Sequence, residues 1–217
     1  MEAQPRLSVQ PSSEPPYAIR SKRLFLRCWE PTDAPSLKEA VDSSLDHLRP
    51  WMPWAGFEPQ SLEEKVMLLR GFRGRFDLGQ DFVYGAFSRD GSEVVGGTGL
   101  HTRVGEGALE IGYWIRASRI GEGLATEFSA ALTRVAFEVC EVDRVEIRVD
   151  PSNERSVAIP RKLGYREEAR LRRRLPAGEN GELRDVLVFT LFRDGYSGSL
   201  SAVAPVEAFD AVGTRVL

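Results

Sequence analysis

The sequence has few of the residues from which metal centres and disulfides are built. Its 217 residues include two histidines, His47 and His101, and two cysteines, Cys28 and Cys140. With so few imidazoles a histidine-rich metal site is not expected, so no metal is predicted. A disulfide stays open on sequence alone, but two separate buried thiols in a reducing cytoplasm agree better with the hydrophobic surroundings of each cysteine. Neither cysteine lies in a turn or beside a histidine, so no cysteine nucleophile is indicated.

Long hydrophobic runs and a strong excess of charge are also absent. No window approaches the roughly 18 consecutive apolar residues that a membrane helix needs. The first twenty residues contain four prolines and no apolar run, unlike a signal peptide. A formal charge of -3 gives no overall attraction to nucleic acid or to an anionic membrane. These absences predict a cytoplasmic protein that acts without a membrane.

The apolar patterning that is present predicts one mixed α/β domain. Residues 1–18 form a predicted flexible leader, 19–195 the domain and 196–217 a peripheral C-terminal tail. Alternating patterns predict strands at 23–29, 82–88, 93–101, 109–116, 144–149, 165–173 and 184–193. Start signals and helical periodicity predict helices at about 33–44, 61–77, 122–139 and 153–163, with an aromatic loop at 47–57. This order predicts a single mixed sheet in which an antiparallel meander feeds parallel crossovers.

A glycine-containing turn joins the predicted strand at 109–116 to the helix that follows. The chain passes through Gly121 and Gly123 immediately before the helix begins. Unpaired N–H groups and the positive end of the helix dipole attract anions at such a point. Glycines let a phosphate approach bare backbone, and the small Ala125 keeps the next turn open. A plain strand-to-helix turn would show the same glycines, so the pattern alone leaves both interpretations open.

The heptapeptide GEGLATE at 121–127 closely resembles the cofactor motif of the GNAT superfamily of N-acetyltransferases, Arg/Gln-x-x-Gly-x-Gly/Ala. Gly123 and Ala125 match its last two positions, whereas Ile120 stands where arginine or glutamine is usual. The resemblance implies a GNAT fold, with a central strand followed by a pyrophosphate-binding helix, and acetyl-CoA as co-substrate. It implies cofactor contacts at Trp114, Ile115, Arg116, Arg119, Ile120, Gly121, Glu122, Gly123, Leu124, Ala125 and Thr126. The first three would contact pantetheine through their backbones. Arg119 and Arg116 lie near Ile120, but charge assistance to the pyrophosphate is expected to be weaker or to come from a different residue.

Further segments resemble the same superfamily. Asn153 to Ser156, followed by Arg161 to Tyr165, is similar to its second cofactor segment. The resemblance implies cofactor contacts at Asn153 and Ser156, and Asn153 is expected to cap a helix and meet pantetheine. Simple helix capping explains Asn153 equally well. The stretches RLFLRCWEPTDA, HLRPWMPWA, EIGYWI and LRDVLVFTLF resemble the ribosomal-protein N-terminal acetyltransferase branch, over about residues 20–193. That resemblance implies a ribosomal protein or the ribosome as partner, and a homodimer.

Direct attack of the amine on the thioester, as in this superfamily, requires a base and an acid. Glu110 is the predicted base, because strand alternation places it on one face with Gly112 and Trp114, although a salt-bridged glutamate would fit the same pattern. The resemblance assigns protonation of the departing thiolate to Ser156, with Tyr165 as the alternative and a surface serine as the plain interpretation. A catalytic glutamate of the branch finds no match, since Leu175 and arginines occupy its neighbourhood.

Two further segments suggest contacts with the acceptor. Trp51 and Trp54 are predicted to form an apolar lid over the acceptor, with Glu110 as a third substrate-binding residue, although packing onto the helix at 61–77 would also explain the tryptophans. Between 161 and 174 there are seven basic residues and two acidic ones. A solvated sheet edge explains most of that charge, and the rest would suit the 3′-phosphate of the cofactor or ribosomal RNA.

The sequence therefore predicts an acetyl-CoA-dependent N-acetyltransferase that acts on a primary amine, either a protein N-terminus or a small molecule. Two other classes stay open. One is a catalytically silent acyl-CoA-binding sensor, which the departure at Ile120 and the missing second acid allow. The other is an enzyme that acetylates an antibiotic or a similar small amine.

Overall fold

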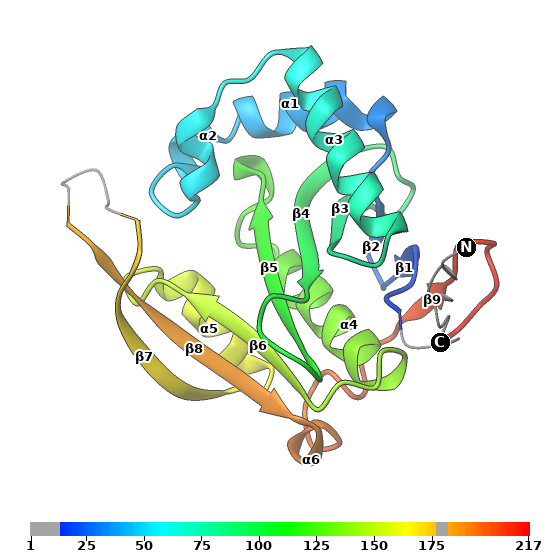
Figure 1. The fold of residues 1–217 in the computed structure, drawn as a ribbon, viewed down its shortest axis with the longest axis vertical. Coiled ribbons are helices and arrows are strands. Elements are labelled where there is room, and N and C mark those ends of the chain that lie inside the picture. The colour runs from blue at the N-terminus through cyan, green and yellow to red at the C-terminus, as the bar shows by residue number, and fades with distance from the viewer. Residues whose placement is uncertain (1–13, 177–181) are drawn as a thin grey trace, which may run out of the picture.

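A computed structural model describes residues 14–176 and 182–217, so most of the predicted leader and the turn at 177–181 lie outside the described residues. Within them, one nine-stranded sheet has the order β7-β8-β6-β5-β4-β3-β2-β1-β9 (Figure 1). The strands are β1 (Ala18–Arg20), β2 (Leu24–Cys28), β3 (Phe82–Ser88), β4 (Val94–His101), β5 (Ala108–Ile115), β6 (Arg144–Val149), β7 (Arg166–Leu175), β8 (Arg184–Phe192) and β9 (Glu207–Phe209). The predicted mixed α/β sheet is confirmed.

The sheet is antiparallel from β2 to β5, and β6 then lies parallel to β5. Beyond β6 the order returns to antiparallel pairing with β8 and β7. The predicted meander followed by a parallel crossover is therefore present. The crossover is made by α4, which connects β5 to β6.

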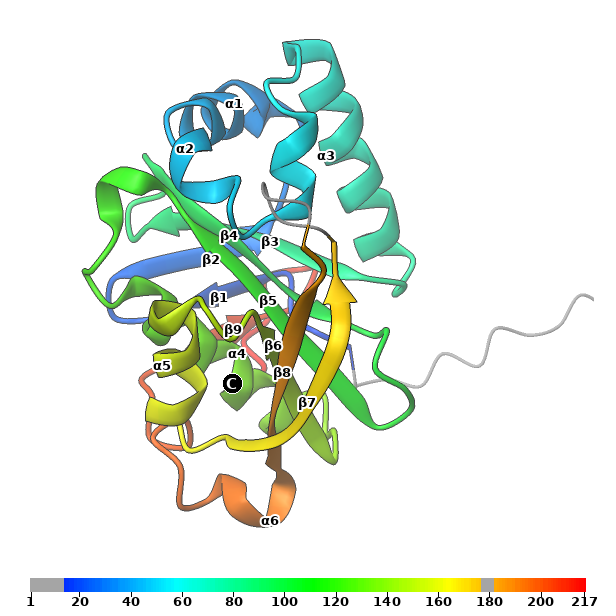
Figure 2. The ribbon, with the colours of Figure 1, turned by 90° about the vertical axis from the view of Figure 1, so that its left-hand side faces the viewer.

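Helices cover both faces of the sheet (Figures 1 and 2). They are α1 (Ala34–Asp42), α2 (Leu45–Leu48), α3 (Leu62–Asp77), α4 (Leu124–Glu138), α5 (Glu154–Lys162) and α6 (Arg193–Tyr196), with 3₁₀ helices η1 (Pro31–Asp33), η2 (Pro53–Phe57) and η3 (Ala117–Arg119). The group α1 to α3 lies on one side, and α4 and α5 lie on the other. The start of α3 carries the predicted capping box, in which Ser61 and Glu64 each accept from the other's backbone N–H.

Helix α4 carries much of the main core. Phe128, Leu132 and Val135 are fully buried against the sheet. A second cluster joins α1 and α3 to Trp29 and Phe87. Because the sheet is packed on both sides, β5 at its centre is held firmly, which is the condition for positioning reactive groups along it.

The described part of the predicted leader, 14–18, and the C-terminal segment both contact the domain. Pro15 and Pro16 at the end of the predicted leader are buried, and β1 begins at Ala18. The C-terminal segment is not merely peripheral: β9 pairs antiparallel with β1, and Val206 and Ala208 are buried. The three residues of β9 are too few to show an alternating pattern, so the sequence alone could not predict this strand.

The aromatic segment at 47–57 is only partly a loop. It overlaps the end of α2 and contains η2, which begins at Pro53. Proline suits the first position of such a turn because its fixed φ is already helical. Glu58, which follows η2, forms a buried ion pair with Lys65 of α3. The segment is thus tied to a long helix.

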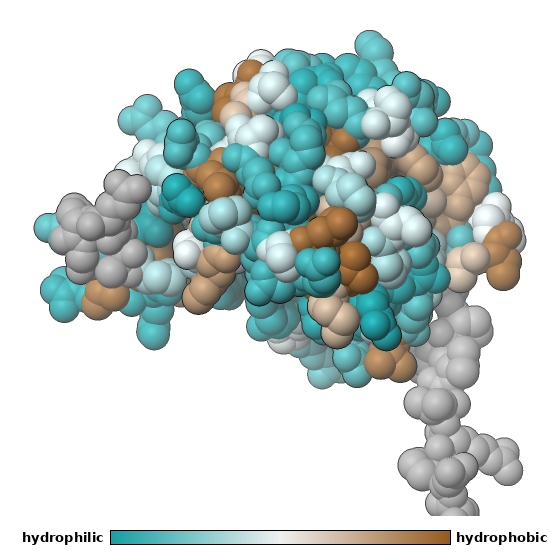
Figure 3. All heavy atoms as spheres, turned by 90° about the horizontal axis from the view of Figure 1, so that it is seen from above, coloured by the Kyte–Doolittle hydropathy of each residue, from teal (hydrophilic) through white to brown (hydrophobic). Residues whose placement is uncertain are grey.

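The two thiols, the surface and the helix lengths complete the description of the fold. Cys28 and Cys140 are both buried and free, and burial raises the pKa of each thiol to about 12. Viewed from the side of α1 to α3, the surface is mainly hydrophilic with small separate apolar areas (Figure 3). Within residues 14–176 and 182–217, no helix combines the length and apolar composition needed to cross a bilayer.

Candidate active site

The central feature of the site is the divergence of two parallel strands. β5 pairs with β6 only from Ala108 to Glu110, and after that point the two strands separate (Figure 1). Arg116 donates its N–H to the Val95 carbonyl of β4. Because backbone groups alternate along a strand, those of Tyr113 and Ile115 point to the opposite side, where β6 has left. This edge of β5 offers backbone donors and acceptors to an extended ligand.

The glycine turn lies directly after this open edge. Gly121 and Gly123 have φ of 85° and 76°, a region that residues with a side chain rarely adopt. No heavy atom lies within 4 Å of the place where a Cβ of Gly121 would stand. Gly123 is the N-cap of α4 and supplies no side-chain cap. The first N–H groups of a 15-residue helix are therefore presented beside bare, exposed backbone, as an anion site requires.

The arginines expected to assist at the turn are already paired with carboxylates, one of which, Glu122, lies in the turn itself. Arg116 binds Glu39 and Glu93, and Arg119 binds Glu93 and Glu122. Arg23 is the guanidinium that lies near Gly123, with Nη2 3.8 Å from the position of a Cβ there. Sequence reasoning missed Arg23, because the hairpin before β2 meets α4 only in three dimensions.

Glu127, the last residue of GEGLATE, holds α4 to the turn between β1 and β2 through hydrogen bonds. Its carboxylate accepts from Ser21 Oγ at 2.8 Å, from Arg23 N at 2.7 Å and from Arg23 Nε at 2.6 Å. Burial alone would raise the pKa of Glu127, but these hydrogen bonds and the charge of Arg23 outweigh it and lower the pKa. The contact fixes the first turn of α4 against the turn between β1 and β2.

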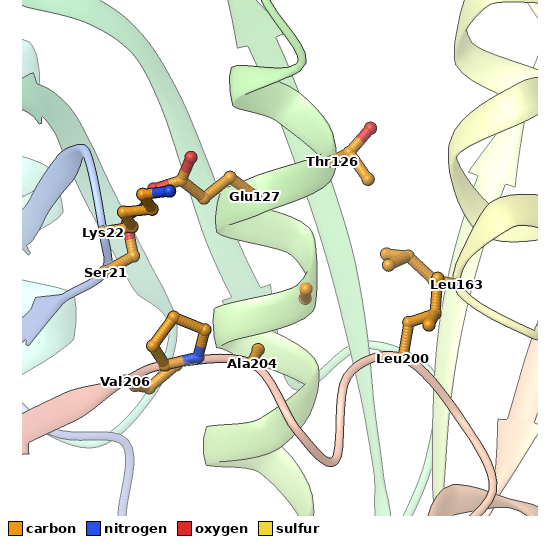
Figure 4. A pocket seen from close by; sticks show the side chains of 10 residues that line it. Ser21, Lys22, Thr126, Glu127, Leu163, Leu200, Ala204 and Val206 are labelled. Atoms are coloured by element: carbon orange, nitrogen blue, oxygen red, sulfur yellow. The ribbon is translucent and has the colours of Figure 1, made fainter.

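A largely apolar hollow of about 240 Å³ lies along α4 next to this contact (Figure 4). It is bounded by Glu127, Leu163 and the C-terminal residues Leu200 to Val206. Thr126, predicted to contact the cofactor, lies on its rim with its side chain directed toward the α5 side (Figure 4). The hollow does not include Gly121 or Gly123, so it is separate from the turn itself.

The second predicted cofactor segment faces the open edge of β5. Asn153 caps α5 by accepting from Ser156 N at 3.1 Å. The Tyr113 hydroxyl of β5 donates to the Ser156 carbonyl at 3.3 Å, so strand and helix meet across the divergence. Ser156 is half-buried. Tyr165, in contrast, is buried in the core and bonded to Thr133, where burial raises the pKa of its hydroxyl. The geometry favours Ser156 over Tyr165 as a group near a departing thiolate.

The other face of β5 forms a glycine-lined surface. Gly97 and Gly99 of β4 lie opposite Trp114 and Gly112 of β5, so these residues share one face of the sheet. The Trp114 ring covers Gly97 and also contacts Trp54, with ring centroids 5.9 Å apart. Trp54, 36% exposed, thus lies at the aromatic border of this surface.

Glu110 shares the face with Gly112 and Trp114 as predicted, but it is buried and paired. Arg103 donates to its two oxygens at 3.1 and 2.5 Å, and Arg148 Nε lies 3.6 Å from Oε2. Accepting a proton would break this bidentate ion pair. The geometry therefore does not favour Glu110 as the proton acceptor.

Two residues that sequence reasoning did not place in the site lie beside Glu110. His101 stands directly opposite Glu110 across the β4–β5 pair, and its Nδ1 is 2.7 Å from Asp81 Oδ1. The register of the hairpin could have placed His101 in the site from sequence, because pairing the strand at 93–101 with the strand at 109–116 brings His101 opposite Glu110. Among the described residues, no group of three or more His, Cys, Asp or Glu side chains is arranged to hold a metal.

An arginine of β8 joins the aromatic segment at 47–57 to the end of β6. Arg184 of β8 donates to the Pro50 carbonyl and to Asp150, each at 2.7 Å. This side chain links β8, the end of β6 and the segment that leads into Trp51. The glycine-lined surface is therefore bordered by elements that are connected to one another.

This combination of a diverging strand pair, an open glycine turn and a capped second helix defines an acyl-CoA-type transferase site. The model of the acetyltransferase (GNAT) domain family matches residues 23–166, and the chain belongs to this family. It is an N-acetyltransferase. The resemblance stated from sequence is confirmed.

Three relatives show how close the similarity is. YdaF of Bacillus subtilis (strain 168), whose name assigns it provisionally to the ribosomal N-acetyltransferases, is 29% identical over 82% of this chain and 96% of its own length. The ribosomal protein uS5-alanine N-acetyltransferase of Escherichia coli (strain K12) is 25% identical, covering 72% of this chain and 82% of its own. The structure of Mycobacterium smegmatis RimJ in complex with CoA-disulfide superimposes with a TM-score of 0.75 at 26% identity, over 86% of this chain and 92% of that one.

Proposed function

We propose that this N-acetyltransferase moves the acetyl group of acetyl-CoA to the α-amine of a ribosomal protein. The observation that carries the donor assignment is the open turn at Gly121 and Gly123 before α4. Its N–H groups would bind the pyrophosphate, with Arg23 adding positive charge. The backbone edge of Tyr113 and Ile115 would bind the pantetheine arm, which directs the thioester toward the point where β5 and β6 separate.

Ser156 is our candidate to protonate the leaving thiolate. It lies on the α5 side of the separation, across from Tyr113. Glu110 has a positioning role in this proposal, because its ion pairs with Arg103 and Arg148 hold the base of the divergence together. The acceptor amine would approach over the glycine-lined face, with Trp54 and Trp51 bordering it.

The ribosomal assignment rests on the relatives' names and on the charge of β7. Arg172, Arg173 and Arg174 are exposed on this edge strand, where the pairing with β8 shifts between Leu171 and Leu175. Arg173 has φ of 56°, which is unusual for a residue with a side chain. Such local distortion next to a charge cluster is common where a strand serves binding. The phosphates of ribosomal RNA match this row of cations.

The test is acetylation of purified ribosomal particles and of peptides that carry the N-termini of ribosomal proteins. Free thiol is followed with acetyl-CoA as donor, and mass spectrometry identifies the modified amine. We expect one α-amine to gain an acetyl group and lysine side chains to stay unmodified. Tight binding of CoA without thiol release from any acceptor would instead indicate a sensor module and contradict the proposal.

A further inference from the structure

The Asp81 and His101 pair has no place in the proposed function so far, although it lies on the same face. His101 ends β4, and Asp81 immediately precedes β3. Their side chains are 15% and 28% exposed, so both are partly withdrawn from water yet reachable. Burial alone would raise the pKa of Asp81, but the hydrogen bond and the charge of His101 outweigh it and lower the pKa.

An ionised Asp81 determines which nitrogen of His101 carries the proton. A carboxylate can only accept a hydrogen bond, so neutral His101 donates through Nδ1 at 2.7 Å. Its Nε2 then keeps a free lone pair. The pair is thus arranged to leave a proton acceptor at Nε2.

The imidazole lies over the backbone of β4 and β5. A Cβ on Gly99 would stand 2.8 Å from Nε2, and a Cβ on Gly112 would stand 3.2 Å from it. A Cβ on Gly99 would force the ring to move, and a Cβ on Gly112 would be a tight contact, so glycine at both positions favours this placement of the ring. Gly112 is the second residue after the last β5–β6 pair, so Nε2 lies over the stretch of β5 that has lost its parallel neighbour.

We propose that His101, oriented by Asp81, is the catalytic residue that takes the proton from the acceptor ammonium. This inference rests on the proposed function, which places the thioester at the open edge of β5. Nε2 presents a free lone pair on this face, whereas both oxygens of Glu110 are bound by Arg103. Gly112 beside the ring is partly exposed, and the His101 side chain is itself 15% exposed, so an amine can reach the imidazole from this side.

The proton and electron movements balance without another reactant. The ammonium gives one proton to Nε2, and the neutral amine attacks the thioester carbonyl carbon, so that a C–N bond forms and an electron pair moves to oxygen. When that pair returns, the C–S bond breaks. The thiolate then takes a proton from Ser156, and the second amine proton restores the serine. His101 returns its proton to solvent, so each turnover yields an amide, a thiol and one proton.

Charges from every neighbouring element act on the imidazole. Asp81 and Glu110 are negative and lie on either side of it, whereas Arg75 of α3, Arg103 after β4 and Arg148 of β6 are positive. Arg103 and Arg148 are held by Glu110, and Arg103 is 61% exposed. Among these charges, the Asp81 carboxylate is the one that contacts the imidazole directly.

The experiment compares the pH dependence of kcat/KM for the full-length chain, His101→Gln and Asp81→Asn, with the fastest ribosomal-protein peptide as acceptor. At pH 7 we expect His101→Gln to lose about 100-fold or more, the lower range of general-base contributions. The deficit should shrink as the pH passes the ordinary α-amine pKa of about 8, because neutral amine then needs no base. Asp81→Asn should also lower kcat/KM, because an amide can donate as well as accept a hydrogen bond and no longer fixes His101 as the Nδ1–H tautomer.

The matched control is His47→Gln, the other histidine of the chain. It should leave the shape of the profile unchanged. An equal loss at every pH in His101→Gln would mean a structural role and overturn the proposal. So would a profile whose acidic limb disappears in Glu110→Gln but stays in His101→Gln.

A second measurement needs no acceptor and separates this inference from the proposed function. Ring ¹⁵N NMR of the intact chain should show His101 as the Nδ1–H tautomer, and Asp81→Asn should change that signal. The Nε2–H tautomer would overturn the inference even if acetylation of ribosomal peptides succeeds. If no peptide were acetylated, the proposed function would fail, and with it the catalytic role of His101.

Discussion

At the residue scale, the strongest constraint is the left-handed backbone at Gly123. Its φ of 76° places it where a branched side chain is strained, and it belongs to the turn proposed to bind phosphate. We expect Gly123→Val to weaken CoA binding about tenfold or more, equivalent to at least ~1.4 kcal/mol. Ser156→Ala should leave CoA binding within about twofold of the original chain and lower the rate of transfer. Calorimetric titration with CoA measures the first effect.

A matched control for backbone strain is Gly213→Val. Gly213 has φ of 82° and nothing within 4 Å of a Cβ position, but it lies in the C-terminal segment. Both valine variants should lose stability by roughly 1–2 kcal/mol, the cost of a left-handed residue with a side chain. Equal loss of CoA affinity in both, or in Gly123→Val and Ser156→Ala, would argue against a phosphate at the turn.

Single residues also show where sequence reasoning reaches its limit. The capping contact between Asn153 and Ser156 could be predicted from sequence, because a helix cap is encoded within four consecutive residues. The contacts of Arg23 and Asp81 could not, because each meets its partner only after strands far apart in sequence have paired. The ion pairs of Glu110 with Arg103 and Arg148 could not be predicted for the same reason. Strand alternation predicted the face of the sheet on which Glu110 lies, but not the charges around it.

At the scale of elements, the junction of the β1–β2 turn with α4 depends on one carboxylate. Glu127 has a lowered pKa in the folded state, so its contribution to stability is complete above its ordinary value of 4.5 and is lost as the pH falls through the folded value. We expect Glu127→Gln to lower the free energy of unfolding at pH 7 by about 2 kcal/mol, the usual range for hydrogen bonds to a charge. Thermal unfolding between pH 3 and 8 measures this.

The difference between the two chains should narrow below pH 4.5, where the original carboxylate also takes a proton. Glu207→Gln is the control, because its ion pair with Arg215 is exposed. Exposed pairs contribute little, so that variant should shift stability by less than about 1 kcal/mol at any pH. A Glu127→Gln deficit that stays constant down to pH 3 would contradict the assignment.

The helices, strands and loops differ in how well the sequence predicted them. Helix α3 followed from its capping box, and the hairpin of β3 and β4 followed from a short polar turn between apolar runs. The segment at 47–57 was misjudged in part, because its order depends on a buried ion pair with α3 and on the Arg184 bridge from β8. Local patterns predict elements, whereas contacts between distant elements decide whether a loop is rigid.

At the scale of the whole molecule, charge is distributed unevenly although the net charge is only -3. If the row on β7 meets ribosomal RNA, Arg172→Glu with Arg173→Glu should lower kcat/KM on ribosomal particles about tenfold or more at low salt, and flatten its salt dependence. On a short N-terminal peptide the same variant should stay within about twofold, because no polyanion is present. Initial rates at several salt concentrations measure both.

The control reverses two charges elsewhere. Arg20→Glu with Arg70→Glu changes the net charge by the same amount at exposed positions away from β7. It should leave the ratio of particle to peptide rates nearly unchanged. Equal effects of the two double variants on ribosomal particles would indicate general attraction rather than a contact through β7.

The pairing of β1 with β9 has a consequence for how the protein is made. β1 forms near the start of the chain, yet its outer neighbour is supplied by Glu207–Phe209. During synthesis the hydrogen-bonding edge of β1 therefore stays unsatisfied until residues 207–209 have left the ribosomal exit tunnel. A nascent chain stalled before residue 207 would expose a strand edge available to neighbouring chains.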